Sequence, residues 1–230
     1  MPPFQSKIFP LERYGHNLTV LARQGSFAPL QGQDATVSKL FQILLREDKK
    51  RHPLLLDDGE ARRWKVVAEA IRRMAVGDAP DPLPQRQVIA LDYEALLADL
   101  PNKKEPFEQR LRSIFNAMHE SAGSFVLFLD HFHRFLGGEE SEIDAATVLV
   151  PFLFRREFQR TIQLIGACTL EQYWRDIECD AAFQRCTFPF FTPEAEQEYQ
   201  PIRAQRDAAI QEKIRRRHFS QEGAKPDHVR

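Results

Sequence analysis

Short apolar runs alternate with helix-like patterns along most of the chain. The apolar runs cover residues 53–56, 87–92, 124–130, 161–168 and 187–191. Between them, apolar residues recur at the three- and four-residue spacing of amphipathic helices over residues 34–46, 60–76, 105–119, 143–158 and 170–183. Continuous apolar strands separated by helices are typical of a parallel sheet covered on both faces. The pattern therefore predicts an α/β fold whose ligands bind at the carboxyl ends of the strands.

The same pattern divides the chain into three parts. Residues 1–10 form an N-terminal extension, residues 11–191 form one domain, and residues 192–230 form a polar, helical tail. Within the tail, residues 203–230 carry eight Lys or Arg and four Asp or Glu. A basic helix end of this kind is typically solvated, so we do not expect a nucleic-acid partner.

Composition narrows the class of protein. Hydrophobic residues make up 43% and charged residues 28% of the 230 residues, and the formal net charge is −1. These values exclude a wholly disordered chain and give no overall field that would attract nucleic acid. The sequence has no run of 18 apolar residues, no signal-peptide pattern and no CxxC pair among its three cysteines. We therefore expect a reduced, cytoplasmic protein without membrane insertion.

A series of segments in residues 11–191 resembles the motifs of a known family. The segments are Leu11–Thr19 with Ala22–Gly25, Gly32-Gln33-Asp34, Val76–Pro80, Phe107–Leu111, Ile165–Tyr173 and Asp180–Phe183. Their order is similar to that of the first ATPase module of the Clp-type AAA+ protein unfoldases, such as ClpB and ClpC. The resemblance implies an AAA+ αβα sandwich with a five-stranded parallel sheet in the order 5-1-4-3-2. It also implies that most of the helical lid and the second ATPase module are missing.

The phosphate-binding loop of that family departs from its motif in this chain. The loop needs G-x-x-x-x-G-K-[ST], in which glycines let backbone amides reach the phosphates, Lys neutralises them and the hydroxyl holds Mg²⁺. The family's loop aligns without a gap on residues 57–64, where Asp57 and Arg62 replace the motif glycines. Arg63 replaces the lysine and Trp64, whose indole is a donor only, replaces the metal ligand.

Charge opposes nucleotide binding at the same loop. Asp57, Asp58 and Glu60 would face the negative phosphates, with Gly59 as the only glycine of residues 57–64. Two like charges about 4 Å apart repel by roughly 4 kcal/mol at an effective dielectric of 20. Arg63 offsets part of this repulsion, but its guanidinium fork is not equivalent to a lysine in a closed loop. The sequence therefore predicts a degenerate phosphate loop and no bound nucleotide cofactor, with weak ATP or ADP binding left open.

Three further positions that the resemblance implies are functional also differ. The family ends the central strand with Asp-Glu, for Mg²⁺ and for the attacking water, and this chain has Asp130-His131. The family's paired arginine fingers fall on Arg185 and Cys186, so one remains. The pore-loop aromatic residue falls on Lys103.

These differences lead to the functional prediction. We expect a pseudo-ATPase, not an enzyme, that acts as a protein-interaction or assembly module. The alternative is a switch that binds nucleotide without hydrolysing it and that regulates or co-assembles with an active Clp-type chaperone. The partner would be a second copy or an active AAA+ relative. Arg185 would reach across the interface, and the helix carrying Phe152, Phe154 and Phe158 would expose aromatic surface, because positions 152 and 154 lie about 200° apart.

His131, His133 and Cys168 also suggest a different enzyme. The two histidines alternate along an extended segment, and Cys168 lies on a neighbouring predicted strand. A zinc site or a cysteine nucleophile with a histidine base is conceivable. The spacing fits no standard zinc pattern, so we expect no metal, a strand-end role for Asp130 and a buried structural thiol at Cys168.

Overall fold

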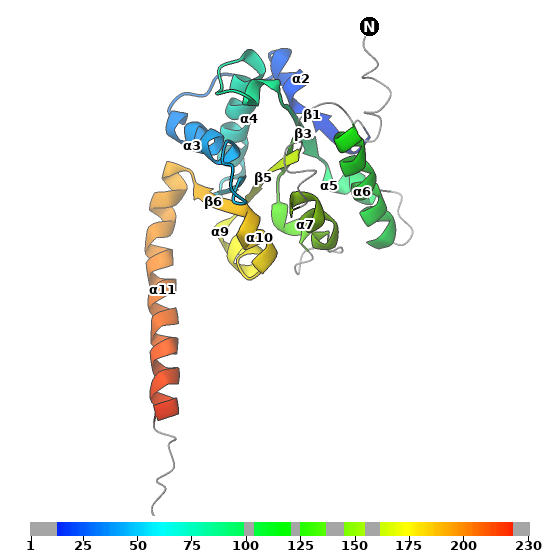
Figure 1. Cartoon of the computed structure of the whole chain (residues 1–230). Coiled ribbons are helices and arrows are strands. Elements are labelled where there is room, and N and C mark those ends of the chain that lie inside the picture. The colour runs from blue at the N-terminus through cyan, green and yellow to red at the C-terminus, as the bar shows by residue number, and fades with distance from the viewer. Residues whose placement is uncertain (1–12, 99–103, 121–124, 137–144, 155–161, 223–230) are drawn as a thin grey trace, which may run out of the picture. The chain divides into compact units, whose positions relative to one another are not determined.

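The computed structural model describes residues 13–98, 104–120, 125–136, 145–154 and 162–222. The chain divides into two compact units, residues 1–192 and residues 193–230. The first unit contains the sheet and the helices that cover it (Figure 1). The second contains one helix, α11 (Pro193–Glu222). In the described part of the chain, no helix combines the length and apolar character needed to cross a membrane.

The strands of the first unit lie close to where the apolar runs predict them. They are β1 (Gly15–Asn17), β2 (His52–Leu56), β3 (Gln87–Leu91), β4 (Phe125–Leu129), β5 (Ile162–Cys168) and β6 (Thr187–Phe191). The helices are α2 (Leu18–Arg23), α3 (Asp34–Leu44), α4 (Glu60–Val76), α5 (Tyr93–Leu97), α6 (Lys104–Glu120), α7 (Ala146–Phe154), α9 (Leu170–Gln172) and α10 (Ala181–Cys186). Short 3-10 turns, η1 (Leu83–Gln85) and η2 (Phe132–Phe135), and a π-helical turn, η3 (Tyr173–Ile177), complete the unit.

The sheet has six strands in the order β1-β3-β4-β5-β2-β6. The five parallel strands, β2 to β6, have the expected 5-1-4-3-2 order when they are numbered from β2. The expectation of a wholly parallel, five-stranded sheet needs correction, because β1 adds an antiparallel edge next to β3. The three residues of β1 are too few to show a periodic pattern in the sequence. A Cβ at Gly15 would lie 2.4 Å from the Ala90 carbonyl oxygen, so this close pairing requires glycine.

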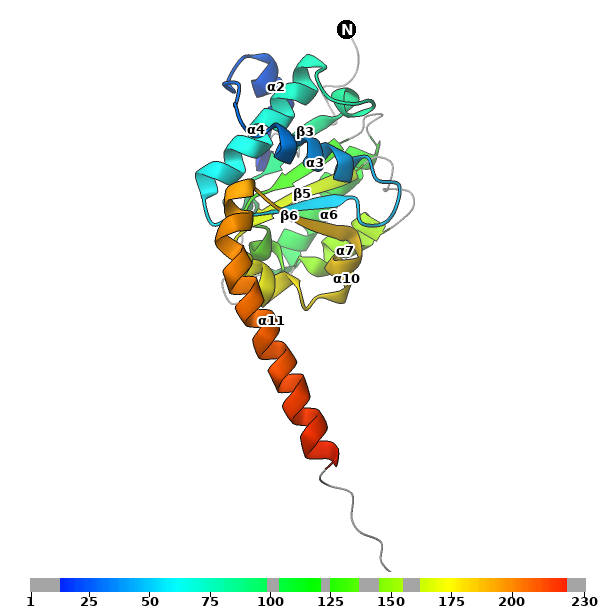
Figure 2. The same cartoon turned by 90° about the vertical axis from the view of Figure 1, so that its left-hand side faces the viewer.

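Helices cover both faces of the sheet and form an αβα sandwich. Helices α2, α3 and α4 pack on one face, and α6 and α7 lie on the other (Figure 2). Residues of β2, β3, β4, β5 and β6 meet α2, α3 and α4 in one core cluster that includes Leu55, Val126 and Ile165. On the opposite face, Phe115 of α6 stacks on Phe152 of α7 with ring centroids 4.4 Å apart.

Two expected helices differ from the structure. The helical pattern over residues 170–183 splits into α9, η3 and α10, because Asp180 accepts hydrogen bonds from the amides of Ala182 and Phe183 and begins a new helix. Of the pattern over residues 143–158, the structure describes α7 only. By contrast, α4 spans its expected residues and ends at Gly77, whose φ is 82°.

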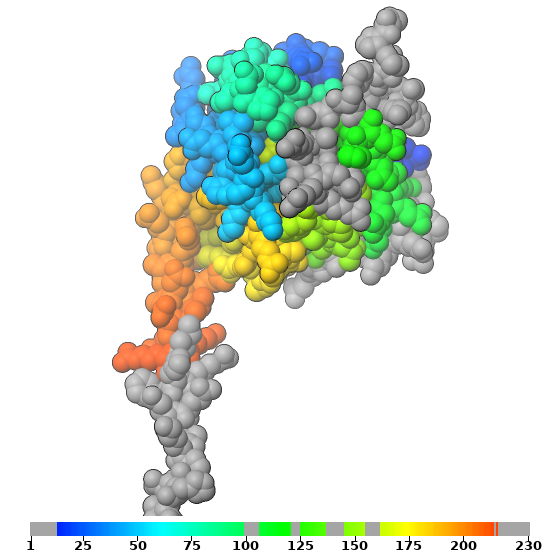
Figure 3. Space-filling view, viewed as in Figure 1, coloured from blue at the N-terminus to red at the C-terminus, as the bar shows by residue number. Residues whose placement is uncertain are grey.

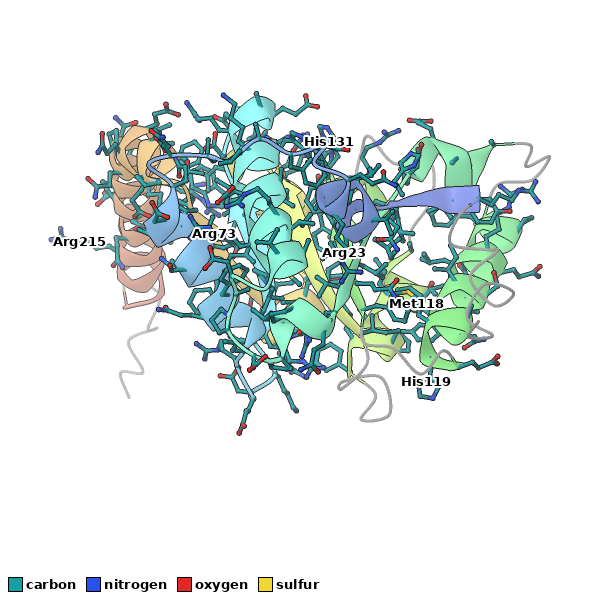
Figure 4. The ribbon with its side chains drawn as sticks, turned by 90° about the horizontal axis from the view of Figure 1, so that it is seen from above. Arg23, Arg73, Met118, His119, His131 and Arg215 are labelled. Atoms are coloured by element: carbon teal, nitrogen blue, oxygen red, sulfur yellow. The ribbon has the colours of Figure 1, made fainter. Side chains whose placement is uncertain are left out.

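A buried carboxylate joins α4 to the segment before it. Glu69 of α4 accepts hydrogen bonds from Arg72 Nε at 2.8 Å, from Arg73 Nε at 2.7 Å and from the Leu30 amide at 3.2 Å. Arg73 also pairs with Asp34 of α3, and Figure 4 shows Arg73 beside that helix. The hydrogen bonds from Arg72, and then those from Arg73 and Leu30, hold the pKa of Glu69 at about 2 although burial opposes this.

We expect Glu69→Gln to lower the free energy of unfolding by about 2 to 3 kcal/mol at pH 7, because charge-assisted hydrogen bonds are lost. The folded pKa of Glu69 lies below its ordinary value of 4.5, so its stabilisation is present above about pH 4.5 and is lost toward pH 2. Urea unfolding at pH 7, 4.5 and 3 measures both effects. Glu60→Gln, on the exposed first turn of the same helix, is the control, and it should change the free energy of unfolding little.

Candidate functional site

Asp57 directly follows β2, at the carboxyl edge of the sheet, and its side chain is fully buried. Its carboxylate accepts the Gly59 amide at 2.7 Å and Arg62 Nε at 2.9 and 3.0 Å. Arg62 Nη2 adds a contact at 2.8 Å, and the Thr192 hydroxyl binds the second carboxylate oxygen. A Cβ at Gly59 would lie 2.9 Å from Arg62 Nε, so glycine leaves room for this ion pair. The chain therefore holds its own carboxylate in a loop that resembles a phosphate cradle.

Arg63 connects this loop to Asp130. The Arg63 side chain is buried, and its Nη1 donates to the Asp57 carbonyl oxygen at 2.5 Å. Its Nε lies 3.5 Å from Asp130 Oδ1, too far for a hydrogen bond but close enough for an ion pair. Asp130 directly follows β4, so both carboxylates lie at the carboxyl edge of the sheet. The two arginines of the loop, Arg62 and Arg63, thus form ion pairs with Asp57 and Asp130, respectively.

His131 has a left-handed backbone conformation, with φ of 51°. Its amide donates to Asp130 Oδ1 at 2.9 Å, and Figure 4 labels it near α4. A non-glycine residue in this conformation is uncommon and is held by its surroundings. Potential metal-ligand atoms of Glu60, Asp130 and His131 lie within 4.8 Å of one another.

This trio differs from the His131, His133 and Cys168 group considered in the sequence. The rings of His131 and His133 are 6.0 Å apart between centroids. Cys168 is buried at the end of β5, and burial raises the pKa of its thiol far above the ordinary value. A neutral thiol is a poor nucleophile, so the burial of Cys168 favours the structural role expected for it.

Trp64 is exposed on the first turns of α4. Its ring meets Phe27 edge-on at 5.8 Å and Phe128 of β4 at 6.0 Å between centroids. Its indole therefore fills space over the sheet where the resembling family places a hydroxyl. Asp58 and Glu60 are also exposed, so these two acids face solvent beside the loop.

The residues expected at an interface differ in their exposure. Arg185 is exposed on α10, which lies at the surface in Figure 3. Phe152 is buried against Phe115, which corrects the expectation that it forms an exposed aromatic surface. Phe154 is half-buried, whereas Phe158 and Lys103 lie outside the described residues.

Sequence reasoning missed two contacts of the site, those of Thr192 and Phe27. Thr192 follows β6, and Leu56 pairs with Phe191 in the adjacent strands β2 and β6. The expected strand order therefore contained the signal that residues 57 and 192 would be neighbours. The sequence contains no comparable signal for Phe27, which lies between α2 and α3.

Comparisons with known proteins agree with the fold and with the resemblance to a Clp-type AAA+ module. No protein-family model matches the chain. The chain is 37% identical over 183 residues to Chaperone protein ClpB 1 of Thermosynechococcus vestitus, a match that covers 79% of the chain and 20% of the relative. It is 34% identical over 195 residues to Chaperone protein ClpB of Chlamydia trachomatis serovar D, which covers 84% of the chain and 22% of the relative. The chain thus spans about a fifth of the length of these relatives.

Solved structures of Hsp104 show the same architecture. The S. cerevisiae Hsp104-ADP complex matches with a TM-score of 0.69 and 28% identity, over 83% of this chain and 33% of that chain. Hsp104 with ATPγS and FITC casein, in its closed state, also matches with a TM-score of 0.69, at 27% identity over 84% of this chain and 34% of that one. The fold is the AAA+ αβα fold, and the chain resembles a Clp-type AAA+ module of the ClpB and Hsp104 kind.

These matches correct one expectation from the sequence. The prediction that the chain is not an enzyme conflicts with its likeness to ClpB and Hsp104, since the sequence places it beside an ATPase class and the solved neighbours include complexes with ADP and ATPγS.

Proposed function

We propose that this chain is a ClpB-like AAA+ module that acts in the cytoplasm as an interaction and assembly module of a chaperone complex. We further propose that nucleotide binds weakly at residues 57–64, because the loop is closed on its own ion pairs. The observation that carries this proposal is the buried Asp57 carboxylate, which accepts the Gly59 amide and the Arg62 side chain. A bound phosphate would need amides and cations of this kind.

The cost of opening the loop supports weak binding. A nucleotide phosphate would have to displace a carboxylate that is already satisfied by the Gly59 amide, Arg62 and Thr192. The displaced Asp57 would then face the phosphate as a like charge. Binding would therefore break a buried ion pair and add a repulsion, and both effects lower affinity.

The exposed arginine of α10 supports a role in assembly. Arg185 occupies a position where the resembling family has an arginine finger, and its side chain lies at the surface. A guanidinium is well suited to bind a carboxylate or phosphate of a neighbouring subunit with two hydrogen bonds. The partner that we propose is a second copy of the chain or a ClpB-like relative. If nucleotide controls this assembly, the chains will associate only when ATP is present.

We expect Arg185→Ala to weaken this association at least about tenfold, the effect of losing about 1.4 kcal/mol. Sedimentation velocity over a range of protein concentrations, alone and mixed with a ClpB-like relative, measures it. Arg23→Ala, which removes an exposed arginine at the end of α2, is the matched control and should associate as the unchanged chain does. The assembly role is contradicted if the unchanged chain does not associate, or if Arg185→Ala and Arg23→Ala lose the same amount of affinity. Association that occurs only with ATP would favour control of assembly by nucleotide.

A further inference from the structure

Two arginines lie at the edge of the sheet opposite the Asp57 site. Arg51 directly precedes β2, and Arg86 directly precedes β3. These strands run parallel to each other through β5 and β4, so their amino ends lie at one edge of the sheet. Asp57 and Asp130 follow the carboxyl ends of β2 and β4, at the other edge. The arginine pair is therefore separate from the loop discussed above.

Each of these arginines has a buried donor that lacks an acceptor. Arg51 Nη2 and Arg86 Nε are buried atoms with no hydrogen-bond partner. Within the described residues, no carboxylate forms an ion pair with either side chain. The side chain of the neighbouring Gln163 donates to the carbonyl oxygens of Leu44 and Arg51, and its Oε1 accepts no hydrogen bond. Buried donors are almost always paired in folded proteins, so this pair of exceptions calls for an explanation.

The charges of the two arginines add a second unfavourable feature. Burial lowers the pKa of Arg86, and burial together with the positive charge of Arg86 lowers the pKa of Arg51. The positive charge of Arg86 thus acts on Arg51 along the edge of the sheet that both residues share. Water molecules would satisfy the buried donors but would leave two like charges together. An anion would satisfy the donors and also neutralise the charges.

We propose that Arg51 and Arg86 bind a small oxyanion of the phosphate type. Guanidinium groups present several N–H donors in a planar fork that matches the oxygens of phosphate. A dianion placed between the two forks would face two positive charges. This inference does not rest on the proposed function of the Asp57 loop, because the two sites lie at opposite edges of the sheet.

The test measures the melting temperature, Tm, of the full chain in inorganic phosphate and in chloride at matched ionic strength. A ligand that binds only the folded state raises Tm in a saturable way. At phosphate about ten times its Kd, we expect a rise of roughly 3 to 6 °C for a chain of this size. Sulfate at the same concentration is a second arm, and it should bind in the same way if a tetrahedral oxyanion is what the pair recognises.

Arg51→Met and Arg86→Met keep an unbranched, flexible side chain but remove the guanidinium group and its charge. Each is expected to abolish the saturable rise in Tm, whereas Arg23→Met, at the exposed end of α2, should retain it. In chloride alone, the first two variants should melt no lower than the unchanged chain, because a repulsion and a buried unpaired donor are removed. The proposal is wrong if phosphate gives no saturable rise in the unchanged chain, or if the rise persists in Arg51→Met and Arg86→Met.

Discussion

Four substitutions in the loop are expected to create a strong ATP site in this chain. Asp57→Gly, Arg62→Gly, Arg63→Lys and Trp64→Thr together give residues 57–64 the G-x-x-x-x-G-K-T pattern. The change removes the carboxylate that accepts the Gly59 amide and supplies a lysine and a hydroxyl for phosphate and Mg²⁺. We expect ATP affinity to increase at least about a hundredfold, or about 2.8 kcal/mol. Isothermal titration with ATP and Mg²⁺ measures the change, after circular dichroism has shown that the variant is folded.

A matched variant isolates the effect of the buried carboxylate. Arg62→Gly, Arg63→Lys and Trp64→Thr, with Asp57 retained, supply the lysine and the hydroxyl but keep a negative charge in the loop. This triple variant should gain much less affinity than the fourfold variant, because Asp57 still accepts the Gly59 amide and repels phosphate. Equal affinities in the two variants would show that Asp57 does not close the site.

Asp57→Ala is expected to lower the free energy of unfolding by about 3 kcal/mol, the scale for removing one partner of a buried ion pair. The substitution leaves Arg62, the Gly59 amide and the Thr192 hydroxyl without their common acceptor. Because Arg62 is partly exposed and regains some solvation, we place the effect at the low end of the usual range. Urea unfolding at pH 7 measures it.

Asp58→Ala is the control for this prediction. Asp58 is the neighbouring residue and is exposed, whereas Asp57 is fully buried. Removing an exposed carboxylate usually changes stability by less than about 0.5 kcal/mol. Similar losses for Asp57→Ala and Asp58→Ala would mean that the ion pairs of Asp57 contribute little to folding.

The sequence predicted most of the sheet, because the buried strands are continuous apolar runs. β4 and β5 are apolar over nearly their whole length, and the family motifs add the order in which the strands lie. β1 could not be predicted in this way. Its three residues are too few to show a period, and its pairing depends on the close approach of Gly15 to Ala90, which is a tertiary contact.

The sequence identified the residues of the candidate site but not the hydrogen bonds and ion pairs that they form. The alignment of residues 57–64 with a phosphate loop identified Asp57, Arg62 and Arg63 as the altered positions. It treated Asp57 as a charge that would face a ligand. In the structure that carboxylate turns inward and binds Arg62 and Thr192, which lie 5 and 135 residues further along the chain. Local sequence patterns do not determine which of several nearby hydrogen-bond donors will bind a buried carboxylate.

The central claim is that the loop at residues 57–64 is closed to nucleotide. The most direct test is to measure the melting temperature, Tm, of the unchanged chain at increasing concentrations of ATP with Mg²⁺. A ligand that binds only the folded state with a Kd well below the concentration used must raise Tm. A closed loop predicts no saturable rise at ATP concentrations up to about 1 mM, which corresponds to a binding free energy weaker than about −4.1 kcal/mol. A saturable rise at micromolar ATP, lost in Arg63→Ala and kept in Arg23→Ala, would show that the loop opens to nucleotide and would contradict this account.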